Sequence, residues 1–217
     1  ARIGEIAGPD AGVWKLPDGD AYYTHMLRRE TSTDLTPAEI HELGLSEVAR
    51  IQAEMRTHFD ALGYPADESF ADSMARIRQD GGIIDTRTAG PGPLVEHYEE
   101  LLGGAAGRID AFFRLQPTTE LSVIPEMSFS GGGGYYASGS LDGTRPGAFH
   151  TGAAPSLIDK AGMPTIAYHE GIPGHHFQIA LAQELDLPLF QSIVFFNGYV
   201  EGWALYAEYL AAEMGLY

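Results

Sequence analysis

Apolar residues recur at helical spacing in the first third of the chain. Thr36, Pro37 and Glu39 are typical of a helix start: Thr36 can cap, Pro37 suits the first helical position, and Glu39 can complete a capping box. The apolar positions then follow the helical period to about Leu62. We therefore predict one helix with a buried apolar stripe, made of Ile40, Leu43, Val48, Ile51, Met55 and Phe59.

The middle of the chain mixes helical patterns with one short strand. Helices are predicted over about residues 68–79 and 93–115, the second weakened by a Gly-Gly pair. The β-branched stretch LSVIPEM that follows is typical of a strand. Residues 130–148 are rich in Gly and Ser, and residues 1–20 carry Gly, Pro and Asp, so we expect both segments to be irregular.

Two strong helical patterns close the chain, over about residues 164–185 and 189–214. A Leu-Asp-Leu-Pro turn separates them, so we expect antiparallel neighbours. The fold class predicted from the whole pattern is mainly α, with a small strand element. We treat residues 1–217 as one region, since this length can bury a sizeable core.

The charge balance excludes some partners. Lys and Arg number 13 against 30 Asp and Glu, a formal charge of -17. A nucleic-acid surface needs clustered cations, and so does binding to an anionic membrane surface. A helix that spans a bilayer needs a run of about 18 apolar residues, and the sequence contains no such run. We therefore expect neither a nucleic-acid partner nor a membrane partner.

The absence of cysteine limits the metal chemistry. With no Cys, disulfides and thiolate metal sites are excluded. Any metal must be held by His and carboxylates, which suits zinc. The N-terminal stretch ARIGEIAGPD lacks the basic and apolar segments of a signal peptide. The lack of a visible signal peptide weakly favours a cytoplasmic location.

The segment YHEGIPGHHFQ, residues 168–178, carries the main candidate chemistry. A hydrolytic zinc site needs three protein ligands, an open position for water and a carboxylate that takes the water proton. His169 and Glu170 supply a ligand and a base in that order. The usual second His, four residues after the first, is replaced by Pro173.

The spacer between the histidines decides which of them could be the second ligand. On a regular helix, a residue seven positions on lies near the face of His169, which favours His176. Residues 171–174 contain two glycines and a proline, however, so we expect a bulge or kink. Looping out two residues would put His175 in the fourth position. The spacing alone leaves both histidines open.

The third ligand should come from the last helical pattern. Glu201 lies in the largely apolar run GYVEGWALYAEYL, and a carboxylate there is costly to bury unless it is paired or binds metal. An antiparallel hairpin would bring Glu201 back towards His169 and His175. Glu208, seven residues on and on the same face, is either a partner to a ligand His or exposed to solvent.

The paired segments HEGIPGHHFQ and YVEGWALYAEYLAAEMG resemble the signature of a bacterial family catalogued as domain of unknown function 885. The stretches TPAEIHELGLSEVARI and LDGTRPGAF resemble the same family. The family is related to the gluzincin metallopeptidases, which hold zinc with two His and a downstream Glu. The resemblance implies His169, His175 and Glu201 as ligands, with His176 as the alternative, and Glu170 as general base and acid.

The resemblance also implies a fold and a function. We expect a helical, gluzincin-like catalytic region that binds Zn²⁺ and cleaves peptides. Family members are usually longer, so the chain is expected to be an internal portion of an incomplete domain, with the remaining segments as partners. The alternative is a zinc-binding relative without catalysis, or a fragment that is active only with the missing parts.

Four further residues are candidates for substrate contact. Tyr135 and Tyr136 follow four glycines, and they could aim a phenol at the substrate carbonyl or simply pack as aromatics. Arg145 could bind a substrate carboxylate, although a structural ion pair is favoured. His150 stands where family members usually have Tyr; it could contact substrate, although a surface-loop position is favoured.

Overall fold

The computed structural model describes residues 12–217 and divides into two compact units. The first unit contains the chain up to Gly63 together with residues 196–198, and the second contains the rest. Of the loop predicted over residues 1–20, residues 1–11 lie outside the described part, and so does the whole stretch ARIGEIAGPD, on which the signal-peptide prediction rests. The remainder of that prediction is wrong in part, because helical elements form there.

The first unit is helical. It contains the 3-10 helix η1 (Val13–Lys15), α2 (Gly19–Thr31) and α3 (Pro37–Ala61). The predicted capping box is confirmed: the Thr36 hydroxyl accepts from the Glu39 N–H at 3.2 Å, and the Glu39 carboxylate accepts from the Thr36 N–H at 2.8 Å.

The predicted apolar stripe of α3 is buried only at its end. Phe59 is 3% exposed, whereas Leu43, Val48 and Ile51 are 53%, 54% and 44% exposed. The prediction of a continuous buried stripe is therefore wrong for these three positions. Periodicity reports which side chains share a helix face, but it does not report whether another element covers that face.

The second unit holds the remaining helices and all five strands found among the described residues. Its helical elements are α4 (Phe70–Asp80), α5 (Thr86–Ala89), α6 (Gly92–Ala106), η2 (Ile109–Ala111), α7 (Met163–Glu170), α8 (His175–Glu184), α9 (Leu189–Ile193) and most of α10 (Asn197–Glu213). Its strands are β1 (Ile83–Asp85), β2 (Leu121–Glu126), β3 (Gly134–Ala137), β4 (Gly147–Gly152) and β5 (Leu157–Asp159). The protein is thus mainly helical with small sheets, as predicted.

The strands form two small sheets. A three-stranded sheet has the order β2-β4-β3, with β2 parallel and β3 antiparallel to β4, and β1 pairs with β5. The strand predicted at LSVIPEM is confirmed as β2. The irregular segment predicted over residues 130–148 is wrong in part, because it contains β3 and the start of β4. These strands were not predicted because the segment is rich in glycine, which is typical of irregular structure. Gly131 and Gly132 have φ of 97° and 71° and form the turn before β3.

The helix predictions are correct in type, but several bounds differ. The helix expected at residues 68–79 is confirmed as α4. The helix expected at 93–115 ends at Ala106, and only η2 follows it. Each of the two closing patterns divides into a pair of helices: α7 and α8, then α9 and α10. Among the described residues, no helix is both long and apolar enough to cross a membrane.

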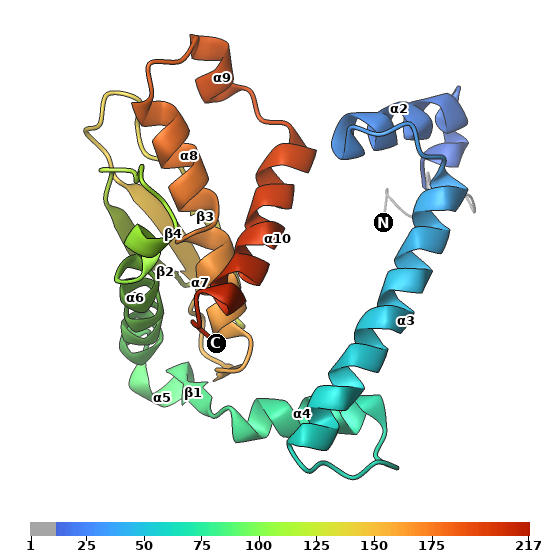
Figure 1. The fold of residues 1–217 in the computed structure, drawn as a ribbon, viewed down its shortest axis with the longest axis vertical. Helices are drawn as coiled ribbons and strands as arrows, with labels where there is room; N and C mark the ends of the chain where they lie inside the picture. The colour runs from blue at the N-terminus through green and yellow to red at the C-terminus, as the bar shows by residue number, and fades with distance from the viewer. Residues whose placement is uncertain (1–11) are drawn as a thin grey trace, which may run out of the picture. The chain divides into compact units, whose positions relative to one another are not determined.

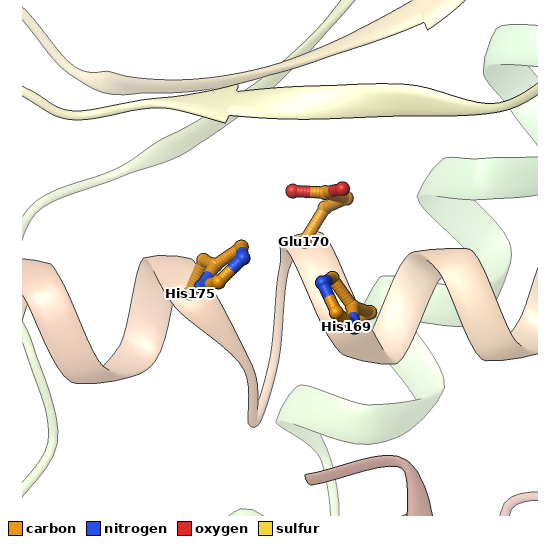
Figure 2. A group of neighbouring side chains, drawn as sticks. All are labelled: His169, Glu170 and His175. Carbon is orange, nitrogen blue, oxygen red and sulfur yellow. The ribbon is translucent and has the colours of Figure 1, made fainter. Parts of the chain in front are cut away.

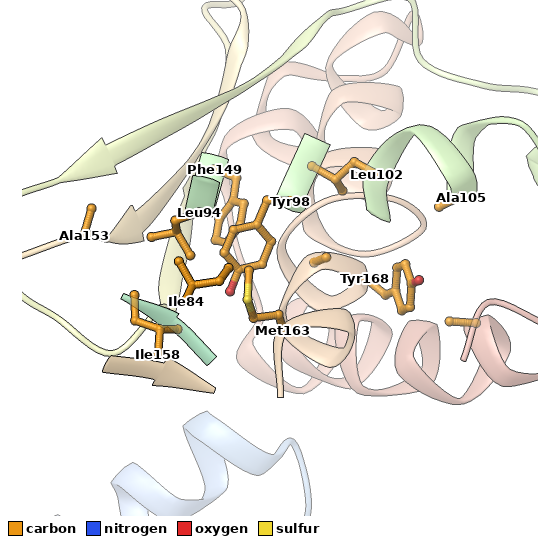
Figure 3. Packing of buried hydrophobic residues seen from close by; sticks show 12 residues of the cluster. Ile84, Leu94, Tyr98, Leu102, Ala105, Phe149, Ala153, Ile158, Met163 and Tyr168 are labelled. Carbon is orange, nitrogen blue, oxygen red and sulfur yellow. The ribbon is translucent and has the colours of Figure 1, made fainter. Parts of the chain in front are cut away.

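The main core lies between α6, α7 and the sheets (Figure 3). Leu94, Tyr98, Leu102 and Ala105 form the buried face of α6, at helical spacing. The ring of Tyr98 meets Phe149 of β4 edge-on, with centroids 4.8 Å apart. Each such large apolar side chain contributes about 1.5–3 kcal/mol on burial. This packing fixes α7, whose last residues belong to the candidate site.

A buried carbonyl at Gly132 joins this core to the glycine turn. It accepts one hydrogen bond from the Tyr98 hydroxyl and another, at 3.0 Å, from the Thr151 hydroxyl. We expect Tyr98→Phe alone to cost about 1 kcal/mol of unfolding free energy, because Thr151 still satisfies the carbonyl. Tyr98→Phe combined with Thr151→Val should cost about 1 kcal/mol more than the sum of the single changes, since the carbonyl is then left without a partner.

Urea unfolding of the four proteins in this cycle measures the difference. Simple additivity would show that the two hydroxyls do not share the Gly132 carbonyl as a common acceptor.

Candidate metal centre

The spacer of four residues, Gly171 to Gly174, separates α7 from α8. A β-carbon on Gly174 would lie 1.9 Å from the carbonyl oxygen of His169 and 2.3 Å from that of Tyr168. A β-carbon on Gly171 would lie 2.3 Å from Leu102 Cδ2. Both positions therefore require glycine for close approach rather than for an unusual φ. The predicted distortion is confirmed, and it is a complete break between two helices.

The carbonyl of Pro173 is held from α10. The indole Nε1 of Trp203 donates to it at 2.9 Å. This contact attaches the spacer to the last helix, two residues beyond Glu201 in sequence. This contact could not be predicted, because Trp203 lies in an apolar run, where a tryptophan is expected to pack.

Three potential ligand side chains meet at the break. His169 and Glu170 come from the last turn of α7, and His175 comes from the first turn of α8 (Figure 2). Their nearest ligand atoms all lie within 4.8 Å of one another. The two imidazole rings are 4.7 Å apart and nearly perpendicular, at 84°. The spacer thus brings His175 to His169 and Glu170, as the looped-out reading of the sequence expected.

Helix α10 returns alongside α8 and α7 and adds two carboxylates (Figure 1). Glu201 Oε2 lies 3.5 Å from Nε2 of His169 and 3.6 Å from Nε2 of His175. Glu208 Oε1 lies 2.8 Å from Nδ1 of His169. A carboxylate only accepts, so Nδ1 of His169 donates to Glu208, and in the neutral imidazole Nε2 has a lone pair free for a metal. The structure therefore brings together all the residues predicted from the two helices, apart from His176.

The distances fit a zinc ion. Imidazole nitrogens and carboxylate oxygens bind zinc at about 2.0–2.2 Å in tetrahedral geometry, which separates neighbouring ligand atoms by about 3.3–3.5 Å. The observed separations of Glu201 from the two histidines, 3.5 and 3.6 Å, are close to this range. An imidazole whose other nitrogen donates to a carboxylate, as His169 does to Glu208, is the usual arrangement of a metal-binding histidine.

Glu170 is the most buried carboxylate of the cluster, at 8% exposure. Burial raises its pKa to about 7, and the charge of Glu201 adds to this, while the charge of His169 and the backbone N–H of Tyr136 act against it. Burial also lowers the pKa of His175, whose Nδ1 has no hydrogen-bond partner among the described residues.

His176 lies outside this cluster. It is 2% exposed, and its Nδ1 lies 3.2 Å from the hydroxyl of Tyr136. Burial lowers the pKa of His176 to about 4, and the backbone of Thr119 acts against this shift. Burial also raises the pKa of Tyr136 to about 12. The phenol of Tyr136 is therefore engaged by the interior, an arrangement that its position after four glycines did not reveal.

Tyr135 and His150 face the other side of the same sheet. They are paired across β3 and β4, and their rings stack 4.8 Å apart at an angle of 3°. Nδ1 of His150 lies 2.8 Å from Oε1 of Glu126. His150 is thus a half-buried strand residue, so the surface-loop interpretation is wrong. Strand β4 was not predicted because the segment before His150 is rich in glycine.

Arg145 lies in the exposed turn between β3 and β4. Its backbone N–H donates to the Ser140 hydroxyl at 2.9 Å, while its guanidinium forms no ion pair with any described residue. The structural ion pair favoured for Arg145 is therefore wrong within the described part of the chain. Its proposed contact with a substrate carboxylate stays a prediction.

Residues 4–217 match the family described as "Bacterial protein of unknown function (DUF885)". The chain belongs to this bacterial DUF885 family. The match spans both units of the DUF885 chain, and it confirms the family resemblance seen in the two signature segments.

A solved structure is similar to the DUF885 chain over its whole length. It is described as a "putative lipoprotein" from Colwellia psychrerythraea, with a TM-score of 0.89 and 30% sequence identity. The alignment covers 100% of this chain and 38% of that one, so the chain spans less than half the length of this relative. The cytoplasmic location gains no support from a relative described in this way. Comparison with curated proteins gives no match.

The close approach of Gly174 to the end of α7 gives a test of the DUF885 spacer. We expect Gly174→Ala to destabilise the protein by about 3 kcal/mol or to prevent folding, because its β-carbon would overlap two backbone carbonyls. Gly104→Ala is the matched control: its β-carbon meets nothing within 4 Å on helix α6, so stability should rise by about 0.5–1 kcal/mol. Urea unfolding of both variants is the measurement; wild-type stability for Gly174→Ala would contradict this packing.

Proposed function

We propose that this protein is a zinc-dependent hydrolase and that its reaction is the cleavage of peptide bonds. The observation that carries the proposal is the position of Glu201 Oε2, 3.5 and 3.6 Å from Nε2 of His169 and His175. These three side chains come from three helices and form a ligand set of two imidazoles and one carboxylate. The buried carboxylate of Glu170 lies beside them, where a proton acceptor is needed.

Each residue then has a chemical role. Zinc held by His169, His175 and Glu201 would polarise the scissile carbonyl and make a water molecule more acidic. Glu170 accepts the proton of the attacking water and delivers it to the leaving nitrogen. Glu208 fixes the tautomer and the orientation of the His169 ring.

A peptide substrate is supported by the sheet beside the cluster. Strand β3 is at the edge of the three-stranded sheet and lies against α7, the helix that ends at Glu170. An extended peptide can add to such an edge by main-chain hydrogen bonds. The paired signature resembles that of the DUF885 family, and the expected relation of this family to gluzincin metallopeptidases also favours peptide cleavage. We therefore include a metallopeptidase-like fold in the proposal.

A second candidate is a zinc site that needs additional polypeptide for catalysis. The similar lipoprotein chain is much longer than this one, since the alignment covers 38% of it. The side chain of Glu201 is 57% exposed, so one side of the cluster is open to other segments. In this case the chain binds zinc but cleaves nothing by itself.

Glu170→Gln separates metal binding from catalysis. We expect the variant to keep about one zinc per chain, because the ligand set is unchanged, while peptide cleavage falls by about 100-fold or more. Metal content is measured by mass spectrometry, and cleavage with a fluorogenic peptide library. Glu213→Gln, an exposed position of α10, is the matched control and should behave as wild type. A zinc-loaded wild type that cleaves no peptide would reject the peptidase and favour the second candidate.

Glu208→Ala tests the partner of His169. Removing the acceptor frees the imidazole to rotate and to change tautomer, so we expect zinc affinity to fall by about 10–100-fold. Competition against a chromophoric chelator measures this affinity, with Glu213→Ala as the control on the same helix. An unchanged affinity would show that Glu208 does not support a metal ligand.

A further inference from the structure

A pocket that is separate from the candidate metal ligands lies between α6, β2 and α8. Its volume is about 390 Å³, within the range of small-molecule sites. None of His169, Glu170, His175 and Glu201 lines it. Its apolar walls come from helix, strand and spacer, and include Leu102, Ala106, Leu121, Val123, Ile172 and Phe177.

The charged groups of this pocket have one sign. Glu99 and Glu120, both exposed residues at its rim, belong to its lining, which contains no Lys or Arg. Neither carboxylate forms a side-chain hydrogen bond or ion pair with another residue in the described part of the chain. The one imidazole of the lining, His176, is occupied by the hydroxyl of Tyr136. The pocket therefore combines an apolar interior with two unpaired negative charges.

We propose that this pocket binds a small organic cation, with its apolar body among the aliphatic and aromatic walls and its ammonium group at Glu99 and Glu120. An ammonium group gives each carboxylate a partner of opposite charge, whereas an anionic ligand of the same shape meets two like charges. The net charge of -17 also raises the local concentration of cations over anions.

The pocket shares the spacer with the metal centre but none of its ligands. Ile172 belongs to the spacer and lines the pocket, while His169 and His175 at the two ends of the spacer do not. A ligand in this pocket therefore needs no contact with the four candidate metal-site residues. Binding should therefore persist in protein treated with a chelator, and this makes a failure here distinguishable from a failure of the proposed hydrolase.

Two probes of equal shape and opposite charge test the pocket: 2-phenylethylamine and 3-phenylpropanoate. We expect the amine to bind metal-free protein with a Kd of about 1 mM or lower, a modest value for a ligand of this size. The carboxylate should bind at least about tenfold more weakly because of the like charges. Calorimetry or ligand-observed NMR measures both. Equal affinities, or no binding of the amine, would overturn the proposal.

Substitutions of two neighbouring glycines on α6 test whether the amine binds in this pocket. Gly103 lines the pocket and Gly104 does not, and a β-carbon on either meets nothing within 4 Å. Gly103→Trp should fill the pocket and weaken amine binding at least about tenfold, whereas Gly104→Trp should leave it unchanged. Glu99→Gln combined with Glu120→Gln should remove the preference for the amine over the carboxylate. Wild-type amine binding by Gly103→Trp would show that the cation binds elsewhere and would overturn the assignment.

Discussion

The backbone of Gly174 lies so close to the carbonyls of Tyr168 and His169 that no side chain fits between them. This contact holds the start of α8 close to the end of α7 across the spacer, and it sets the distance between two histidines that are six residues apart (Figure 2). Gly171 adds a second close approach, to Leu102 of α6. The candidate metal centre is thus built on backbone packing, and its side chains follow from where two helix ends are held.

Helix α10 completes the arrangement because one helix carries three different contacts. Trp203 holds the spacer through the Pro173 carbonyl, Glu201 approaches both histidines, and Glu208 fixes one of them. A shift of α10 along its axis would change all three contacts together. The antiparallel return of the chain after α8 therefore matters more to the site than any single residue in the connection.

The sequence predicted the parts that depend on local pattern. The capping box at Thr36 and Glu39 was predictable because its bonds are made within one turn. The break after Glu170 was predictable because a spacer rich in Gly and Pro disfavours a continuous helix. The spacing alone left His175 and His176 open, and the set His169, His175 and Glu201 followed from the family resemblance. The strands β3 and β4 were missed, since glycines dominate their approach and a short strand has little alternation to read. The bond between His176 and Tyr136 was not predictable, because the two residues are 40 positions apart and meet only through the sheet.

Leu102 has three neighbours of different kinds: the core of α6 and α7, the spacer at Gly171, and the pocket beside β2. In most proteins the interior can drift by compensating substitutions while the reactive groups remain unaffected. That freedom is narrow here, because a change in the volume of this one aliphatic side chain is passed to the segment that spaces two metal-binding candidates. A change in the volume of Leu102 is therefore expected to disturb the candidate metal centre as well as the core.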